Sequence, residues 1–184
     1  MKPRAHGIAA VAALAAFALA GCTQPDQPAA SVEGVPIPTS EVRAVATAVQ
    51  PFLQQGADPT SQAVRDAVLA EASTIIAQRN DVALGDDVVN QGIQASQILQ
   101  AMAESDAASY AAADGTARSG GRTAAENISR TNIVVEALGE SVYLEQLRDL
   151  DITLNPKFGI WAPSPPFVYE SNLSYAAPAD RLRG

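Results

Sequence analysis

The stretch SVEGVPIPTSEV, Ser31 to Val42, carries the signals that start the fold. Val32 and Ile37 lie on either side of Gly34, a pattern that predicts a short extended segment or a tight hairpin. The next four residues, Pro38–Glu41, offer hydroxyl N-caps and an acid for a first turn, so a helix should begin there. A short β element followed at once by a helix therefore opens the folded part of the chain.

Amphipathic helices are predicted after this stretch. A first helix is expected over Ser40–Gln55. A second begins at Asp58-Pro59, where the aspartate serves as N-cap and the proline takes the first helical position. A third is expected over Asp86–Met102, with Asp86 and Asp87 at the positive end of its dipole. No loop with alternating acids follows these two aspartates, so they indicate a helix start rather than a Ca²⁺ site.

The chain changes character after the third predicted helix. Residues 104–122 are small and polar with weak periodicity, and we interpret them as a loop or a loosely packed helix. The segment Thr123–Glu126 matches a capping box, in which the two side chains bond to each other's backbone N–H groups. It predicts the start of the longest helix, which runs to about Leu150 and includes Gly139 at a cost of about 1 kcal/mol relative to alanine.

A short strand is expected where the helices end. Ile152–Leu154 precedes a turn at Asn155-Pro156, and we predict that it pairs with the segment near Val32–Ile37. Prolines are frequent in residues 162–184 and predict an extended tail with little packing. The sequence therefore predicts a mainly α fold: one compact domain of four to five helices over residues 32–161, with a short β pairing between its N- and C-terminal ends.

The first residues have the organisation of an export signal. Lys2 and Arg4 form a positively charged start, and the apolar run Ile8–Ala20 has the length of a signal peptide. That run is too short to span a membrane, which takes about 20 apolar residues. It ends at Gly21-Cys22, and this ending resembles the lipobox of bacterial lipoproteins.

The lipobox resemblance implies a lipid anchor. Residues 1–21 would be the signal peptide, cleaved between Gly21 and Cys22, and the Cys22 thiol would carry a diacylglyceryl group. Residues 22–31 would then be the lipidated cysteine and a flexible tether. Since two acyl chains anchor a protein stably, we expect the protein at the extracytoplasmic face of the cell membrane. The alternative is an ordinary secretory signal with a chance cysteine.

Composition restricts the possible chemistry. The formal net charge of -8 becomes -10 when residues 1–21, with two basic residues and no acid, are removed. An acidic protein does not neutralise phosphates, so no nucleic-acid partner is expected. The mature chain would hold no histidine and only the acylated cysteine, which excludes Ser-His-Asp and Cys-His catalysis, zinc sites built on those residues, and disulfides.

We accordingly expect no enzyme activity, no metal and no cofactor. An enzyme that uses only carboxylates stays open in principle. Glu136, Glu140 and Glu145 lie on the predicted long helix, but a solvated acidic face explains them better.

Two segments carry a family resemblance. VEGVPIPTSEV, Val32 to Val42, resembles the start of the N-terminal domain of SurA-like periplasmic chaperones, where a short strand, a glycine turn and a capped helix follow one another. ITLNPKFGIW, Ile152 to Trp161, resembles the closing segment of actinobacterial lipoproteins with such a domain. The order of the intervening elements is also similar, so the resemblance covers about residues 30–162.

The resemblance implies ATP-independent binding of unfolded exported polypeptides in apolar grooves between helices. Some family members carry a parvulin-type prolyl isomerase domain after this region. Too few residues follow Trp161 for such a domain, and the His and Cys usual in parvulin sites are missing, so no isomerase activity is expected.

Four aromatic residues are candidate client contacts: Phe52, Tyr110, Phe158 and Trp161. For each there is a plainer interpretation: Phe52 in the core, Tyr110 on a passive loop, and the last two fastening the terminal strand to the helices. Asn127-Ile128-Ser129 matches a glycosylation sequon, which we interpret as a chance match.

Two classes of function follow from these observations. The first is a membrane-anchored chaperone for unfolded or exported polypeptides. The second is a structural or accessory lipoprotein that binds one dedicated partner in the envelope.

Overall fold

The computed structural model describes residues 27–105, 107–165 and 167–169. The predicted signal peptide, its cleavage site and the lipidated Cys22 lie outside these residues. Within them the protein is mainly helical with small antiparallel strand pairings, which confirms the predicted fold class.

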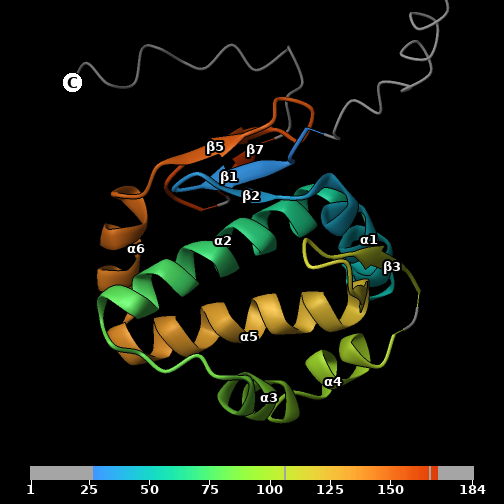
Figure 1. Cartoon of the computed structure of the whole chain (residues 1–184), viewed down its shortest axis with the longest axis horizontal. Coiled ribbons are helices and arrows are strands. Elements are labelled where there is room, and N and C mark those ends of the chain that lie inside the picture. Colours follow the sequence, from blue (N-terminus) through green and yellow to red (C-terminus); the bar gives the residue numbers. More distant parts are fainter. Residues whose placement is uncertain (1–26, 106, 166, 170–184) are drawn as a thin grey trace, which may run out of the picture.

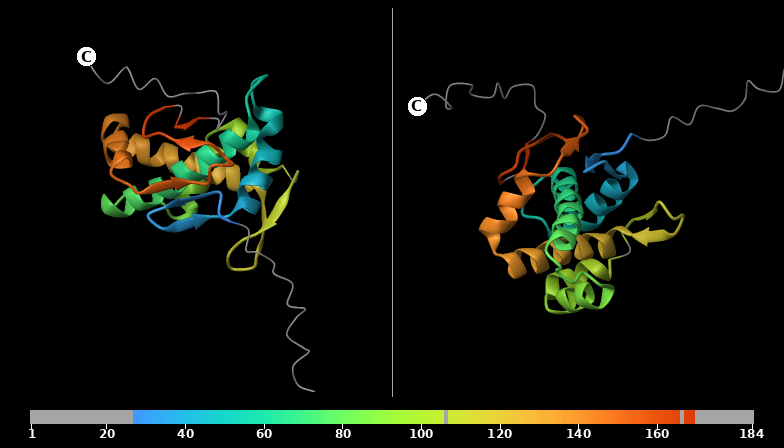
Figure 2. Two further views of the ribbon diagram at one scale, coloured as in Figure 1. Left: turned by 90° about the horizontal axis from the view of Figure 1, so that it is seen from above. Right: turned by 60° about the vertical axis from the view of Figure 1, so that its left-hand side comes forward.

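Two long helices form the centre of the molecule. α2 (Pro59–Arg79) and α5 (Gly120–Leu138) pack against each other along their lengths (Figure 1). Figure 2 shows α1 (Thr39–Val49) and α6 (Glu140–Arg148) on opposite sides of α2. The remaining helical elements are the single turn η1 (Gln50–Phe52), α3 (Asp86–Gln94) and α4 (Gln97–Ala103). The last two pack on the face of α5 that points away from α2.

A three-stranded antiparallel sheet joins the two ends of the domain. β1 (Ala30–Val32) lies between β2 (Val35–Ile37) and β5 (Ile152–Leu154), with Ser31 opposite Thr153. The predicted pairing of the N- and C-terminal segments is therefore confirmed. The β1–β2 turn is tight because Glu33 and Gly34 both adopt positive φ, as a two-residue hairpin requires.

The main core lies between the sheet, α1, α2, α5 and α6. Its fully buried side chains include Val32 of β1, Val45 of α1, Ile76 of α2 and Leu147 of α6. Each such burial stabilises the fold by roughly 1.5–3 kcal/mol. A second, smaller core forms where α3 and α4 pack on Ala125 of α5.

The predicted second helix begins as expected. The Asp58 carboxylate accepts hydrogen bonds from Thr60 N and Ser61 N, and Pro59 takes the first helical position. The first helix, in contrast, ends at Val49 rather than Gln55, because the chain tightens into η1 at Pro51.

The predicted helix over Asp86–Met102 is wrong in one respect, because it is two helices. α3 starts at Asp86 as expected but ends at Gln94. Ser96 is in an extended conformation, and its Oγ accepts from Leu99 N to cap α4. The break lets both short helices bend around α5 and bury apolar residues against it.

Residues 104–122 contain a hairpin that the sequence analysis missed. β3 (Ser109–Ala111) pairs with β4 (Ala117–Ser119), and α5 begins directly afterwards with Ser119 as its N-cap. The predicted capping box is therefore wrong. Thr123 lies inside the helix and its Oγ1 donates to Ser119 O, while Glu126 pairs with Arg122.

The predicted long helix to Leu150 is also wrong, because Gly139 divides it into α5 and α6. Gly139 has φ +81° and ψ 148°, a backbone conformation that essentially only glycine adopts. The chain turns there, and α6 is placed against α2 instead of continuing the line of α5.

Part of the predicted extended tail is folded. β6 (Ile160–Trp161) pairs with β7 (Val168–Tyr169), Val168 is buried, and β7 packs on α2. The Trp161 and Phe167 rings stack with centroids 5.7 Å apart. The expectation of little packing is therefore wrong for this segment, while residues 170–184 lie outside the described residues.

Candidate functional site

The four aromatic residues predicted to contact clients do not form one surface. Phe52 on η1 is 37% exposed, whereas Tyr110 on β3 is 8% exposed and therefore buried. Phe158 and Trp161 are partly buried and pack against the main core. Only Phe52 of the four is an exposed large side chain.

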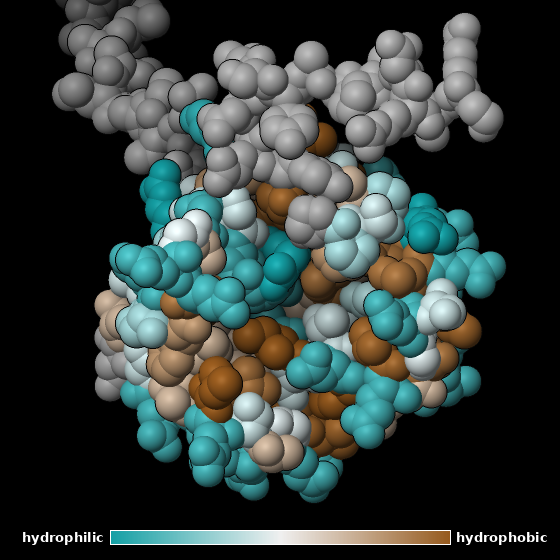
Figure 3. All heavy atoms as spheres, turned by 180° about the vertical axis from the view of Figure 1, so that it is seen from behind, coloured by the Kyte–Doolittle hydropathy of each residue, from teal (hydrophilic) through white to brown (hydrophobic). Residues whose placement is uncertain are grey.

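The other exposed large apolar residues are distributed over separate elements. Val35 lies on β2, Ile98 on α4, Val142 on α6 and Ile160 on β6. Figure 3 shows the apolar side chains of one face in several groups with polar ones between them. The described residues thus offer scattered apolar contacts, and one of their concave features is lined mainly by polar groups.

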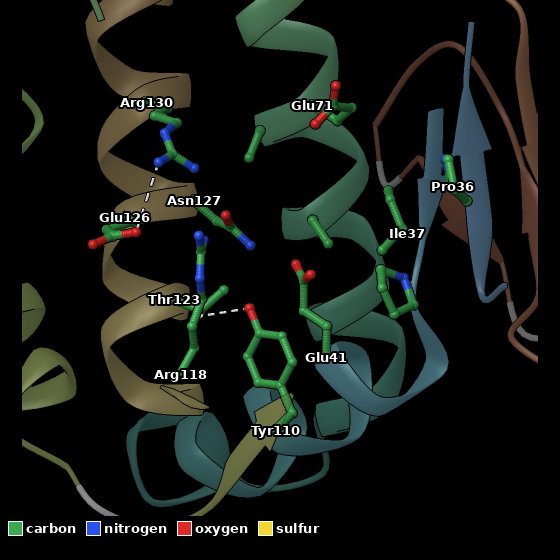
Figure 4. Close-up of a pocket in the computed structure, with 13 residues that line it drawn as sticks. Pro36, Ile37, Glu41, Glu71, Tyr110, Arg118, Thr123, Glu126, Asn127 and Arg130 are labelled. Carbon is green, nitrogen blue, oxygen red and sulfur yellow. Dashed lines mark hydrogen bonds and ion pairs between the residues drawn. The ribbon is translucent and has the colours of Figure 1, made fainter. Parts of the chain in front are cut away.

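That feature is a cavity of about 150 Å³ between α1, α2, α5 and the β3–β4 hairpin (Figure 4). We call it the polar cavity. Its ionisable and polar lining includes Glu41, Glu71, Tyr110, Arg118, Asn127 and Arg130. Side chains from five elements therefore meet there.

Close backbone packing holds these elements together. Gly120, the first residue of α5, lies against α1 so tightly that an added Cβ would be 2.3 Å from Ala44 O. Gly120 follows Arg118 by two residues, and Ala44 follows Glu41 by three. The contact therefore brings β4, which carries Arg118, close to α1, which carries Glu41, so that these two residues face each other across the cavity.

The carboxylates on one wall are desolvated. Burial raises the pKa of Glu41 above its ordinary value, and the nearby Glu71 charge adds to this rise; the Arg118 charge and hydrogen bonding from Asn127 and Tyr110 oppose it. Burial also raises the pKa of Glu71, against the effect of Arg130. Both carboxylates thus lie where a compensating cation would be favourable.

The arginines on the opposite wall already have acidic partners. Arg118 lies 3.7 Å from an Asp114 oxygen, and Arg130 lies 3.6 Å from a Glu126 oxygen. Among the described residues, neither Glu41 nor Glu71 has a cationic group within ion-pair distance. The charges left without a direct partner in the cavity are therefore the two carboxylates.

The Tyr110 hydroxyl lies between Thr123 and Glu41 in the cavity. Its hydroxyl lies 3.1 Å from Thr123 Oγ1, and the threonine hydrogen is directed to Ser119 O. The Tyr110 hydrogen is then shared between Thr123 Oγ1 and the Glu41 carboxylate, since hydrogen bonding from Tyr110 lowers the pKa of Glu41. Burial raises the pKa of this hydroxyl, so it stays neutral.

Asn127 is the polar side chain that stands out. It is 4% exposed, and its Nδ2 is a buried nitrogen with no hydrogen bond of ordinary length among the described residues; the acceptor that it faces is Glu41, whose pKa this amide lowers. In Figure 4 its amide points across the cavity towards Glu41. A buried polar group left without a partner costs roughly 1–3 kcal/mol, so a bound oxygen acceptor would be favourable here.

A more open groove adjoins the cavity along α5. Its volume is about 440 Å³, and Asp86, Asn90 and Arg122 are among its lining residues. It shares Arg118, Thr123, Glu126 and Arg130 with the polar cavity. The Arg122 guanidinium bonds to both Glu126 and Asn90, which orders the wall of this groove.

The sequence does not predict this site. It indicates Asn127 only as part of a sequon and Glu41 only as a first-turn acid. A signal was present, since Thr123, Asn127 and Arg130 are spaced four and three residues apart and so lie on one face of a helix. Their neighbours from α1 and the hairpin could not be inferred from that spacing.

The cavity offers hydrogen bonds and ion pairs for binding. Within residues 27–105, 107–165 and 167–169, no group of His, Cys, Asp and Glu is arranged to hold a metal ion. None of the helices in the described part of the chain has the length and apolarity needed to cross a membrane. Comparison with known proteins finds no family model, no curated protein and no solved structure that matches this chain.

Proposed function

We propose that this protein is a lipid-anchored lipoprotein of the extracytoplasmic membrane face that binds exported polypeptides without catalysis or ATP. The lipobox at Gly21-Cys22 supports the location. The observation that carries the binding role is the polar cavity, with its unpartnered Asn127 amide and its two carboxylates without direct cationic partners. Such a site favours one dedicated envelope partner over many clients.

The chaperone role for unfolded polypeptides is the second candidate. It is favoured by the order of elements: a hairpin, then helices, then a strand that returns to the hairpin, as the SurA-like resemblance implies. The scattered exposed apolar residues favour it less, because unfolded clients bind contiguous apolar surface.

Crosslinking in cells separates the two candidates. A photoreactive residue replaces Ala117, which is exposed and lines the groove, and a control replaces Glu145, which is exposed on α6. A dedicated partner gives one dominant adduct at Ala117 that the Glu145 control lacks. Many unrelated adducts support the chaperone, and no adduct with an envelope protein at either position refutes both.

A substitution at Cys22 tests the lipid anchor. Cys22→Ala should abolish acyl labelling with radioactive palmitate and stop cleavage before residue 22. A variant that is still acylated and cleaved normally would overturn the lipoprotein part of the proposal.

A further inference from the structure

The polar cavity combines two complementary features at short range. Glu41 is an acceptor for a cation, whereas Asn127 Nδ2 is a buried donor with no hydrogen bond of ordinary length. Asn127 and Glu41 point towards each other from α5 and α1 (Figure 4). A ligand that meets both needs therefore carries a positive group and a neutral or negative oxygen close together.

The volume of the cavity restricts that ligand further. A protein cavity of about 150 Å³ accepts a molecule the size of benzene, so this one holds a group of about five or six heavy atoms. The N-terminal residue of a polypeptide has a nitrogen, a Cα, a carbonyl carbon, a carbonyl oxygen and, if small, one Cβ. Its ammonium and carbonyl groups are only two bonds apart along the backbone.

Apolar side chains also line the cavity. Ile37 of β2 and Ala67 and Ala70 of α2 also line the cavity and provide an apolar surface for a small side chain. The adjoining groove of about 440 Å³ shares four lining residues with the cavity and gives the following residues of the ligand a path along α5.

We propose that the polar cavity binds the free amino terminus of a polypeptide, with the α-ammonium group on Glu41 and the first carbonyl oxygen on Asn127 Nδ2. This inference rests on the proposed function and names what the protein recognises in its partner. Glu71 lies on the same side of the cavity and adds negative charge, which favours the ammonium group. A lysine side chain fits less well, because it carries no oxygen next to its ammonium group.

The test is a titration of the full-length protein, purified in detergent, with a short peptide that begins Ala-Gly-Ser and carries a dye at its C-terminus. Fluorescence anisotropy should show binding of the free peptide and at least about tenfold weaker binding of the N-acetylated one. An acetylated peptide with an internal lysine should bind as weakly as the other acetylated peptide. Equal binding of free and acetylated peptides refutes the proposal.

Variants of the protein test whether Glu41 and Asn127 bind the peptide. Glu41→Gln should weaken binding of the free peptide by about tenfold or more. Glu145→Gln, which removes the same charge at an exposed position of α6, should leave the affinity unchanged. Asn127→Leu, which removes the unpartnered donor, should weaken binding severalfold. In the wild type the Asn127 side-chain amide resonances should shift on titration, a change that a merely structural asparagine would not show.

Other results of these experiments would assign the cavity to a different ligand. Alaninamide that competes as tightly as the peptide would show that small amines are the ligand and would overturn the polypeptide assignment. Tighter binding of the acetylated lysine peptide would assign the cavity to a basic side chain. If crosslinking at Ala117 still identifies one partner while acetylation has no effect, this inference fails and the proposed function stands.

Discussion

The contact between Gly120 and α1 gives the sharpest test of the geometry. A Cβ placed on Gly120 would be 2.3 Å from Ala44 O, 2.5 Å from Ala44 C and 3.1 Å from Val45 N. The first distance is about 1.1 Å short of the 3.4 Å at which ordinary van der Waals contact begins. The obstructing atoms belong to the backbone of α1, which cannot rotate away as a side chain can.

Gly120→Ala should therefore destabilise the fold by about 2 kcal/mol. Overpacking of this kind costs typically about 1–3 kcal/mol, and the cost should lie in the upper half of that range because the obstacle is rigid backbone. Alanine also lowers the conformational entropy of the unfolded chain, which offsets about 0.4–1 kcal/mol of this cost. For a domain of this size the thermal midpoint should fall by about 6–8 °C.

The assay is thermal and urea unfolding followed by far-ultraviolet circular dichroism. Gly85→Ala is the matched control, because Gly85 also borders a helix start but its added Cβ would be within 3.4 Å only of the Asp87 side chain. That control should change stability by less than about 1 kcal/mol. A Gly120→Ala midpoint equal to that of the wild type would refute the close contact, and with it the placement of Arg118 opposite Glu41.

Three further changes follow from single features of the structure. Glu41→Gln should stabilise the protein at pH 7, because burial raises the pKa of Glu41 above its ordinary value of 4.5 and the wild type therefore loses stability as pH rises through the folded pKa. Paired urea titrations should show the gain disappear towards about pH 4, and a gain independent of pH would contradict the assigned cause. Gly139→Ala should cost about 1–3 kcal/mol by calorimetry, since alanine is strained at φ +81° and ψ 148°; an unchanged melting temperature would exclude that turn. Tyr143→Phe removes the 3.1 Å buried hydrogen bond to Ser73 and should cost about 1 kcal/mol in urea unfolding, whereas no loss would mean that water replaces the hydroxyl.

Local signals were sufficient for the parts of the fold that depend on neighbouring residues. The Asp58-Pro59 helix start, the Glu33-Gly34 turn and the helical class depend on side chains and dihedral angles within about four residues. The sequence predicted the helix start and the class, and it gave the turn as one of two alternatives. The pairing of Ile152–Leu154 with β1 was also predicted, because short β segments at the two ends of a helical domain have few other partners.

The remaining features depend on contacts between residues far apart in the chain. Gly139 has the same local context whether a helix continues or ends, and the packing of α6 on α2 decides that it ends. The hairpin over Ser109–Ser119 has little apolar alternation, so its pairing and the burial of Tyr110 beside Thr123 depend on the tight approach of Gly120 to α1. The sequence by itself therefore predicted an export-type N-terminus, which stays a prediction, and determined a helical domain closed by its two ends. Only the tertiary structure, by bringing Glu41 of α1 opposite Asn127 of α5, decided where that domain has a polar cavity.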